Sequence, residues 1–201
     1  FLLELIAEFE DPRIFNAALG TGETTIGLLK AGITDILSNE IDPEYSRMAL
    51  EQAEKLGISI DLTTHDWRNI PEELYGQFDV VLCLGNSITL LFEKENRLRA
   101  LQNFYQTLRE GGKLIIDERN YQYHFLDGLF RFSGNSVYFG KAKVEVWPSS
   151  IANDRVILEY KHKETGARAH LEAYPFKKGE LKGNLEEVGC VVEETFGDYE
   201  K

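Results

Sequence analysis

The sequence is poor in cysteine and histidine and has no long apolar run. Its 201 residues include two cysteines, Cys83 and Cys190, and four scattered histidines. Both cysteines lie inside apolar segments, so we expect free thiols in a reducing, cytoplasmic compartment rather than a disulfide. The histidines and cysteines lack the spacing of metal ligands, so we expect no bound metal. A membrane-spanning helix needs ~20 consecutive apolar residues, which no segment has, so a membrane partner is not expected.

Positive charge is scarce as well. There are 22 lysines and arginines against 34 aspartates and glutamates, which gives a formal net charge of −12. A protein that binds nucleic acid needs a basic patch to neutralise phosphates, and none stands out, so nucleic acid is not expected as a partner. The negative field instead favours small cations or zwitterions. The composition leaves the oligomeric state open.

Short apolar runs alternate with amphipathic segments along most of the chain. Strands are expected at residues 13–19, 35–41, 59–64, 78–85 and 113–118, and helices at residues 20–30, 42–56 and 94–109. Asp42 and Pro43 are a favourable N-cap and first helical residue for the second of these helices. Apolar strands that alternate with helices predict an α/β fold, in which a mostly parallel sheet is covered by helices on both faces.

An antiparallel insertion is expected at about residues 129–176, because apolar and polar residues alternate there. The alternating segments are residues 136–147, 155–163 and 167–176, with a turn at 164–166, which predicts two or three strands. A last helix and a last strand follow at residues 179–189 and 190–196. Because ligands of open α/β sheets bind outside the carboxyl ends of the strands, the insertion can cover that edge as a lid. We expect residues 1–201 to form a single domain.

The first expected strand runs into a glycine-containing turn, "NAALGTGETT". Gly20 and Gly22 allow a sharp turn and a close approach of the backbone to a ligand. Thr25 stands where the dinucleotide fingerprint requires a third Gly or an Ala, so an unphosphorylated nucleoside is favoured over a pyrophosphate. A tight turn without any ligand is the alternative.

The ends of the second and third strands carry acidic residues. Glu40 follows Gly22 by eighteen residues, and a carboxylate at this position can accept both hydroxyls of a ribose. Asp66 can accept a hydrogen bond from an adenine amino group, and Trp67 can cover the ring. The alternatives are a solvated loop charge for Glu40, and an exposed Asx-turn followed by a core tryptophan at residues 66–67.

Polar residues also follow the fourth and fifth strands. Asn86 can hold a polar group of a substrate or cap the next turn, and its spacing does not decide between the two. Arg119 offers a planar fork that matches a carboxylate. The alternative for Arg119 is a surface salt bridge with Glu118 or Asp117.

The motifs "ALGTG", "HDWR", "LCLGNSI" and "IDERNYQY", in this order and spacing, resemble those of the class I S-adenosylmethionine-dependent methyltransferases. The resemblance is closest to the glycine and glycine/sarcosine N-methyltransferases, and it runs through the whole chain. "LGNS" followed about thirty residues later by "D-x-RNY" is its most specific part. It implies a Rossmann-like class I methyltransferase fold with an antiparallel β insertion between strand five and the last helix. It also implies S-adenosyl-L-methionine as the cofactor and a small amino acid or amine as the substrate.

The resemblance assigns roles to individual residues. The implied cofactor-binding residues are Ala18, Gly20, Gly22, Glu40, Asp66, Trp67 and Leu84. The implied substrate-binding residues are Asn86, Arg119, Tyr121, Tyr138 and Tyr174. Arg119 binds the carboxylate of the amino acid, and the tyrosines orient or close over the substrate. No nucleophilic side chain is implied, because methyl transfer to an amine depends on orientation.

Two features depart from the family pattern. Asn16 stands where the family has an acidic residue at the end of strand one, which removes a charge beside the cofactor. The chain opens on "FLLELIAEFE", after the segment that carries an aromatic lid in the family, so we expect that upstream segment to be missing. The alternatives are a methyltransferase for a different small molecule and a non-catalytic nucleoside-binding module. A dehydrogenase is disfavoured by Thr25.

Overall fold

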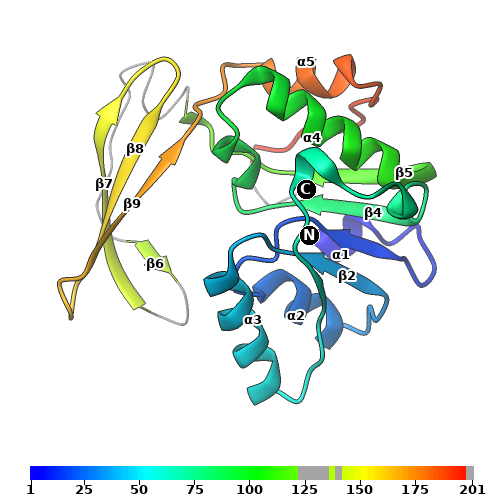
Figure 1. Ribbon diagram of the computed structural model, residues 1–201, viewed down its shortest axis with the longest axis horizontal. Coiled ribbons are helices and arrows are strands. Elements are labelled where there is room, and N and C mark those ends of the chain that lie inside the picture. Colours follow the sequence, from blue (N-terminus) through cyan, green and yellow to red (C-terminus); the bar gives the residue numbers. More distant parts are fainter. Residues whose placement is uncertain (122–135, 139–141, 198–201) are drawn as a thin grey trace.

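The computed structural model describes residues 1–121, 136–138 and 142–197 (Figure 1). Its centre is a five-stranded parallel sheet with the order β3-β2-β1-β4-β5. The strands are β1 (Ile14–Asn16), β2 (Ile36–Asn39), β3 (Asp61–Thr63), β4 (Phe78–Cys83) and β5 (Leu108–Ile116). The expected Rossmann-like α/β fold is confirmed.

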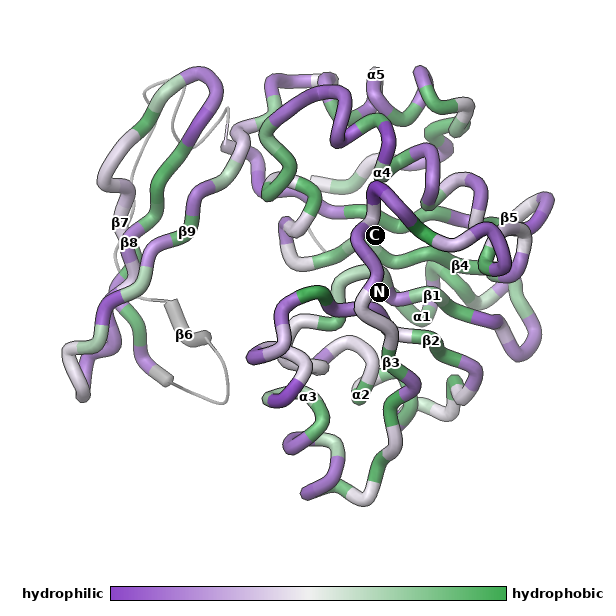
Figure 2. Tube along the Cα trace, in the orientation of Figure 1, coloured by the Kyte–Doolittle hydropathy of each residue, from purple (hydrophilic) through white to green (hydrophobic). Residues whose placement is uncertain are grey.

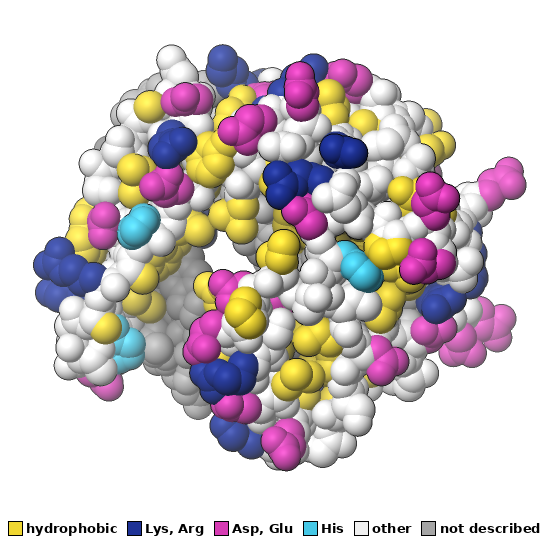
Figure 3. Space-filling model, in the orientation of Figure 1, with side chains coloured by type: hydrophobic (Ala, Val, Ile, Leu, Met, Phe, Trp, Pro, Cys, Tyr) yellow, Lys and Arg dark blue, Asp and Glu magenta, His cyan; other side chains and the backbone are white. Residues whose placement is uncertain are grey.

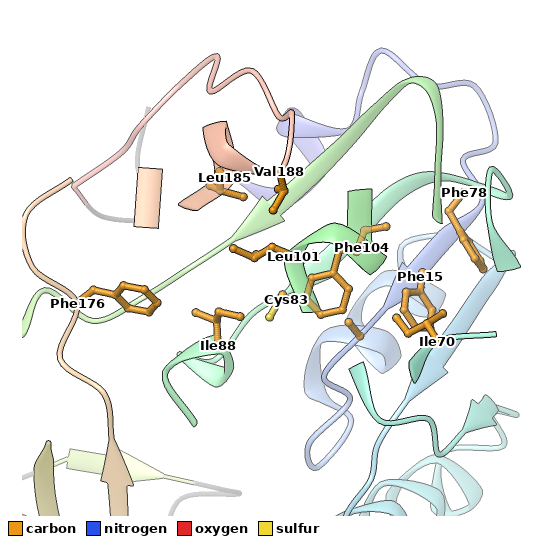
Figure 4. Packing of buried hydrophobic residues seen from close by; sticks show 12 residues of the cluster. Phe15, Ile70, Phe78, Cys83, Ile88, Leu101, Phe104, Phe176, Leu185 and Val188 are labelled. Carbon is orange, nitrogen blue, oxygen red and sulfur yellow. The ribbon is translucent and has the colours of Figure 1, made fainter. Parts of the chain in front are cut away.

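Helices cover both faces of this sheet. They are α1 (Leu2–Leu5), α2 (Glu23–Lys30), α3 (Pro43–Lys55), α4 (Lys94–Thr107) and α5 (Glu180–Glu187), with 3₁₀ turns η1 (Trp67–Asn69), η2 (Glu72–Leu74) and η3 (Ser87–Leu90). Figure 2 shows hydrophobic residues concentrated along the strands. Neighbouring residues of β4 point to opposite faces, as the pleat of a strand requires. Val81 belongs to the same core cluster as Leu101 and Phe104 of α4, and Val80 belongs to the cluster that contains Leu28 of α2. Figure 4 shows Leu101 and Phe104 within the first cluster.

Helix α3 begins as expected from its cap. The Asp42 carboxylate accepts hydrogen bonds from the backbone N–H groups of Glu44 at 2.8 Å and Tyr45 at 3.4 Å, and Pro43 is the first helical residue. Three small residues form the buried face of the helix: Ser46, Ala49 and Ala53. They let the helix axis lie close to the turn after β1.

A second, antiparallel sheet lies beside the carboxyl ends of the parallel strands (Figure 1). Its strands pair in chain order: β6 (Ser136–Tyr138), β7 (Ala142–Ile151), β8 (Val156–His162) and β9 (Arg168–Ala173). The expected turn at 164–166 is confirmed, because the Gly166 N–H donates to the His162 carbonyl at 2.9 Å. The described sheet has four strands where two or three were expected, since β6 adds to the edge of β7.

One expected helix–strand boundary and one expected strand are wrong. The helix expected at 94–109 ends at Thr107, and the strand expected from residue 113 already begins at Leu108, so Gly111 and Gly112 lie within β5. The last strand, expected at 190–196, is absent from the described structure. Cys190 and Val192 of this segment pack against the core, while Val191 is 86 % exposed. The alternation of side chains is present, but the ladder of hydrogen bonds that defines a strand is not.

Both thiols are free, as expected, although only one of them is fully buried. Cys83 is the last residue of β4, and burial raises the pKa of its thiol; Cys190 is half-buried. Of the helices described here, none combines the length and the apolar composition needed to cross a bilayer.

Candidate functional site

The residues expected to bind ligands gather where the parallel strands end. Figure 1 shows these carboxyl ends facing the antiparallel sheet, and Figure 3 shows a hollow between the two parts of the molecule. Hydrophobic and acidic side chains lie along the part of its rim visible in that view. The loops after β1, β2, β4 and β5 therefore meet at one edge, as the topology of an open parallel sheet requires.

The two glycines in the turn after β1 have different surroundings. Both have positive φ, +56° at Gly20 and +95° at Gly22. A Cβ built on Gly22 would lie 3.1 Å from the Cβ of Ala49 in α3, whereas a Cβ on Gly20 would have no heavy atom within 4 Å. A side chain at Gly22 would therefore need Ala49 to shift by a few tenths of an ångström, so Gly22 allows the close packing of α3. Gly20 exposes its backbone to open space, and this fits the close approach of a nucleoside cofactor.

Alanine substitutions should separate these two roles. Gly20→Ala should raise the dissociation constant of S-adenosylmethionine about tenfold or more, while the left-handed backbone costs only about 1–2 kcal/mol of stability. Gly22→Ala adds a tight contact with Ala49 to the same backbone strain, so we expect a larger loss of about 2–4 kcal/mol. Calorimetric titration and denaturant unfolding would measure the two quantities. Equal effects of both variants on cofactor affinity, after correction for unfolded protein, would contradict the assignment of Gly20.

The Glu40 carboxylate is hydrogen-bonded to this turn. Its Oε2 accepts the Gly20 N–H at 2.8 Å, and its Oε1 accepts the Asp42 N–H at 2.9 Å. A carboxylate has about four acceptor positions, so each oxygen keeps one for a further donor. This arrangement fits a pair of ribose hydroxyls and joins the two cofactor-binding residues expected from the sequence.

Asn39, one residue earlier, was not expected to matter. Its side chain is buried, and its Nδ2 donates to the carbonyls of Ala17 at 3.4 Å and His65 at 3.0 Å. Its Oδ1 accepts from the Thr63 hydroxyl at 3.0 Å and the His65 N–H at 2.7 Å. The amide therefore joins the ends of β1, β2 and β3. An asparagine at a strand end is typical of an ordinary turn, so the sequence gives no signal for this role.

Asp66 and Trp67 are both engaged within the protein. The Asp66 carboxylate receives the Arg68 guanidinium at 2.5–3.1 Å and the Arg68 N–H at 2.9 Å, which is an Asx-turn. The hydrogen bonds from Arg68 lower the pKa of Asp66. The Trp67 Nε1–H donates to the Ala17 carbonyl at 2.7 Å, and the ring packs edge-on against Phe104. These contacts match the alternative, an Asx-turn followed by a core tryptophan. The roles of Asp66 and Trp67 in adenine binding stay predictions.

Asn16 is buried at the end of β1 and takes part in an uncharged network. Its Nδ2 donates to the Thr25 hydroxyl at 2.9 Å, and the Thr25 and Ser38 hydroxyls are 3.0 Å apart. The side chain that replaces an acidic residue is thus bonded into helix α2. Ala18 is half-buried just beyond it, and Leu84 packs against the core cluster on the α2 side.

Asn86, Arg119 and Tyr121 are brought together. Asn86 has φ +65°, and its backbone N–H donates to the Asp117 carboxylate at 2.6 Å. Its Oδ1 accepts the Arg119 N–H at 2.7 Å, and its Nδ2 donates to the Tyr121 hydroxyl at 2.8 Å. The loops after β4 and β5 are therefore joined through one side chain. Asp117 was not expected among the site residues, although it belongs to the motif "IDERNYQY".

The three predicted tyrosines differ in their surroundings. Tyr121 is 0 % exposed, and its ring packs with Val146, Leu158 and other residues of the antiparallel sheet. The Tyr174 hydroxyl donates to Glu180 Oε1 at 2.7 Å. Tyr138 pairs with Ala142 at the end of β6, and its side chain lies outside the described part of the structure. Their contacts with a substrate stay predictions.

Glu118 was considered only as a salt-bridge partner, yet it has a distinctive environment. Its Oε2 is buried and has no hydrogen-bond partner. Burial, and then the negative charges of Asp117 on the same loop and Glu180 of α5, raise its pKa to about 7. A carboxyl group with such a pKa changes its protonation near neutrality.

This shifted pKa should make stability depend on pH. The folded protein binds a proton at Glu118 up to about pH 7, whereas the unfolded chain releases it near its ordinary pKa of 4.5, so stability falls as pH rises through this window. The full shift corresponds to about 3.4 kcal/mol, and solvent screening of a partly exposed group reduces it to about 1–2 kcal/mol. Glu118→Gln should be more stable than wild type by this amount at pH 8, with no such gain at pH 5.

Urea unfolding at pH 5, 6, 7 and 8 would measure the effect. Glu110→Gln removes the same charge from an exposed residue of β5, the strand that precedes the Glu118 loop, and is the matched control. A pH dependence of the Glu118→Gln variant equal to that of wild type would contradict the prediction.

Comparisons with known proteins agree with this geometry. Residues 14–112 match a family model described as a methyltransferase domain. The whole chain is 33 % identical to a glycine/sarcosine N-methyltransferase from Parasynechococcus marenigrum, of which it covers 71 %. It is 32 % identical to one from Aphanothece halophytica and covers 74 % of that protein. A solved S-adenosylmethionine-dependent methyltransferase from Clostridium acetobutylicum has the same fold, with a TM-score of 0.72, 16 % identity, and coverage of 93 % of this chain and 77 % of that one.

Proposed function

Because the chain belongs to the glycine/sarcosine N-methyltransferase family, we propose that it methylates the amine of a small amino acid such as glycine or sarcosine. It is an S-adenosylmethionine-dependent methyltransferase. The cofactor supplies the methyl group from a sulfonium, whose charge is lost on transfer. The observation that carries the proposal is the joining of Asn86, Arg119 and Asp117 at the ends of β4 and β5.

The residues proposed to hold the cofactor lie on the other half of the strand edge. The backbone at Gly20 would lie under its amino-acid part, and the two remaining acceptor positions of Glu40 would take the ribose hydroxyls. Asp66 would share its carboxylate between Arg68 and the adenine amino group. We propose Ala18, Gly22, Trp67 and Leu84 as the remaining wall of this site.

Transfer to an amine needs alignment rather than a nucleophile from the protein. Arg119 would bind the carboxylate of the amino acid through two parallel hydrogen bonds, and this fixes where its amine points. Asn86, held by its bonds to Arg119 and Tyr121, would bind the same substrate from the β4 side. Such orientation can contribute about 7–11 kcal/mol of the barrier. Tyr138 and Tyr174 are proposed to exclude water from the reacting atoms.

A second candidate is methyl transfer to a different small amine or acid. The same cofactor site serves it, and the difference of one methyl group in the pocket is worth only about 1–3 kcal/mol. The Asp117 carboxylate, which lies on the loop that carries Arg119 and accepts the Asn86 N–H, favours a substrate that also has an ammonium group. This favours a zwitterionic amino acid over a simple acid.

The direct test is the formation of S-adenosylhomocysteine, measured by mass spectrometry. The protein would be offered glycine, sarcosine, dimethylglycine and a panel of other small amines and acids. Turnover with glycine or sarcosine is expected. Turnover with other members of the panel alone would move the function to the second candidate. Cofactor binding without turnover of any compound would contradict the proposal and favour a nucleoside-binding module.

A further inference from the structure

Arg97 of α4 is a buried arginine that the proposed function does not use. Its side chain is 2 % exposed, and its Nη2 lies 3.2 Å from Oε1 of Glu180 at the start of α5. Its Nη1 donates to the carbonyls of Leu91 at 3.0 Å and Phe92 at 2.5 Å. A buried ion pair of this kind is weak evidence for stability, since apolar residues of the same volume often serve equally well. Its directional contacts need another explanation.

Tyr174 is the residue on which these contacts converge. The Arg97 guanidinium carbon lies 3.8 Å from the centroid of the Tyr174 ring, within the range of a strong cation–π contact. The Tyr174 hydroxyl donates to the same Glu180 oxygen that receives Arg97, at 2.7 Å. Burial and the bond to Glu180 raise the pKa of this phenol, so it remains a donor. Arg97 therefore holds the ring, and Glu180 holds the hydroxyl.

The backbone of Tyr174 connects this cluster to the candidate site. Tyr174 follows β9 directly, and its N–H donates to the Thr89 carbonyl of η3 at 2.7 Å. The Thr89 hydroxyl in turn donates to the Asn86 carbonyl at 2.6 Å. Two residues further on, Phe176 points into the core cluster next to Ile88 of η3 (Figure 4). The end of β9 is thus fixed against the turn that begins at Asn86.

We propose that Arg97 and Glu180 are positioning residues for the amino-acid substrate. They hold Tyr174, and with it the end of β9, in one position relative to Asn86, so that the antiparallel sheet is seated over the ends of β4 and β5. The proposal rests on the proposed function, because the quantity that it sets is the geometry of the substrate pocket. Neither residue is expected to touch the substrate or the cofactor.

Glu180→Gln is the most informative change. An uncharged amide keeps the size of the side chain but loses the charge-assisted bonds to Arg97 and Tyr174. Glu187→Gln is a matched control, because Glu187 also lies in α5 and pairs with a cation of α4, Lys94, at 2.8 Å on the exposed surface. We expect Glu180→Gln to raise the KM for the amino acid about tenfold, with the dissociation constant of S-adenosylmethionine within about twofold of wild type. Glu187→Gln should change neither.

A double-mutant cycle with Tyr174→Phe tests whether the effect passes through Tyr174. If it does, the double variant should have nearly the KM of the worse single variant. Additive effects, or an unchanged KM with only a lower melting temperature, would overturn the proposal. A rise in the cofactor dissociation constant equal to the rise in KM would also overturn it, because it would indicate general damage to the fold.

Hydrogen exchange keeps this test separate from the proposed function. If wild type turns over none of the amino acids, the proposed function fails, and the positioning role is then decided by exchange alone. Glu180→Gln should speed exchange of the Tyr174 amide and of the β8–β9 ladder relative to wild type and Glu187→Gln. Unchanged exchange at these amides would overturn the proposal.

Discussion

Arg119→Ala should raise the KM for the amino-acid substrate about 30- to 1000-fold and leave the dissociation constant of S-adenosylmethionine within about twofold of wild type. The expected size follows from the loss of a bidentate charge-assisted contact with a carboxylate, about 2–4 kcal/mol in a partly buried site. The Arg119 backbone bond to Asn86 does not depend on the side chain, so the loop after β5 should keep its place. Steady-state kinetics and calorimetric titration of the cofactor measure the two constants.

Two further variants sharpen this result. Arg119→Lys keeps the charge but loses the planar fork, so its KM should lie between those of wild type and Arg119→Ala. Arg47→Ala removes an exposed arginine of α3 that pairs with Glu44 and Glu51, and it should behave as wild type. Loss of cofactor binding in Arg119→Ala would show that this side chain belongs to the cofactor site instead.

Asn86→Asp should lower kcat/KM about 100- to 1000-fold while the protein stays folded. Aspartate has nearly the shape of asparagine, and it can still accept the Arg119 N–H and can accept a hydrogen bond from the Tyr121 hydroxyl. It adds a negative charge beside Asp117, in the pocket where Arg119 is proposed to bind the carboxylate of the substrate. The added charge and the loss of the amide N–H donor together amount to about 3–4 kcal/mol of lost transition-state stabilisation.

The comparison with Asn86→Ala separates charge from structure. Alanine removes the hydrogen bonds that Asn86 makes with the Arg119 N–H and the buried Tyr121 hydroxyl and also takes up φ +65°, so stability should fall by about 2–4 kcal/mol. Denaturant unfolding and steady-state kinetics of both variants are the measurements. An Asn86→Asp variant that retains wild-type KM would exclude Asn86 from the substrate pocket.

The fold could be predicted where local signals and packing agree. The apolar runs of β1, β2 and β4 and the Asp42–Pro43 cap each have a local cause, and the structure contains all of them. The last strand was predicted wrongly from the same kind of signal. Residues 190–196 alternate as a strand does, but a strand also requires a paired neighbour, and pairing is a property of the tertiary structure. The alternation at 136–147 predicted one strand, whereas the structure divides this segment between the short β6 and the start of β7.

The candidate site was predictable by position but not by contact. Glu40, Asn86 and Arg119 were recognised as strand-end residues, and they lie at one edge. The burial of Tyr121 against the antiparallel sheet depends on residues 146–173, far away in the sequence. Asn39, Glu118 and Arg97 gave no signal, because each is an ordinary surface residue type whose role comes from burial. Sequence patterns predict which elements form, whereas the burial and the hydrogen bonds of a polar side chain depend on which residues pack over it.

The pairing order of the two sheets has a consequence for how the chain folds. Each strand of the antiparallel sheet pairs with its neighbour in the chain, so its hairpins close over short loops. Strand β1 must pair with β4, and Ile14 lies opposite Val80, 66 positions later. Closing the longer loop costs more chain entropy, and such contacts limit folding rates. We therefore expect the antiparallel hairpins to form before β1 pairs with β4, and we expect this pairing to be a slow step in folding.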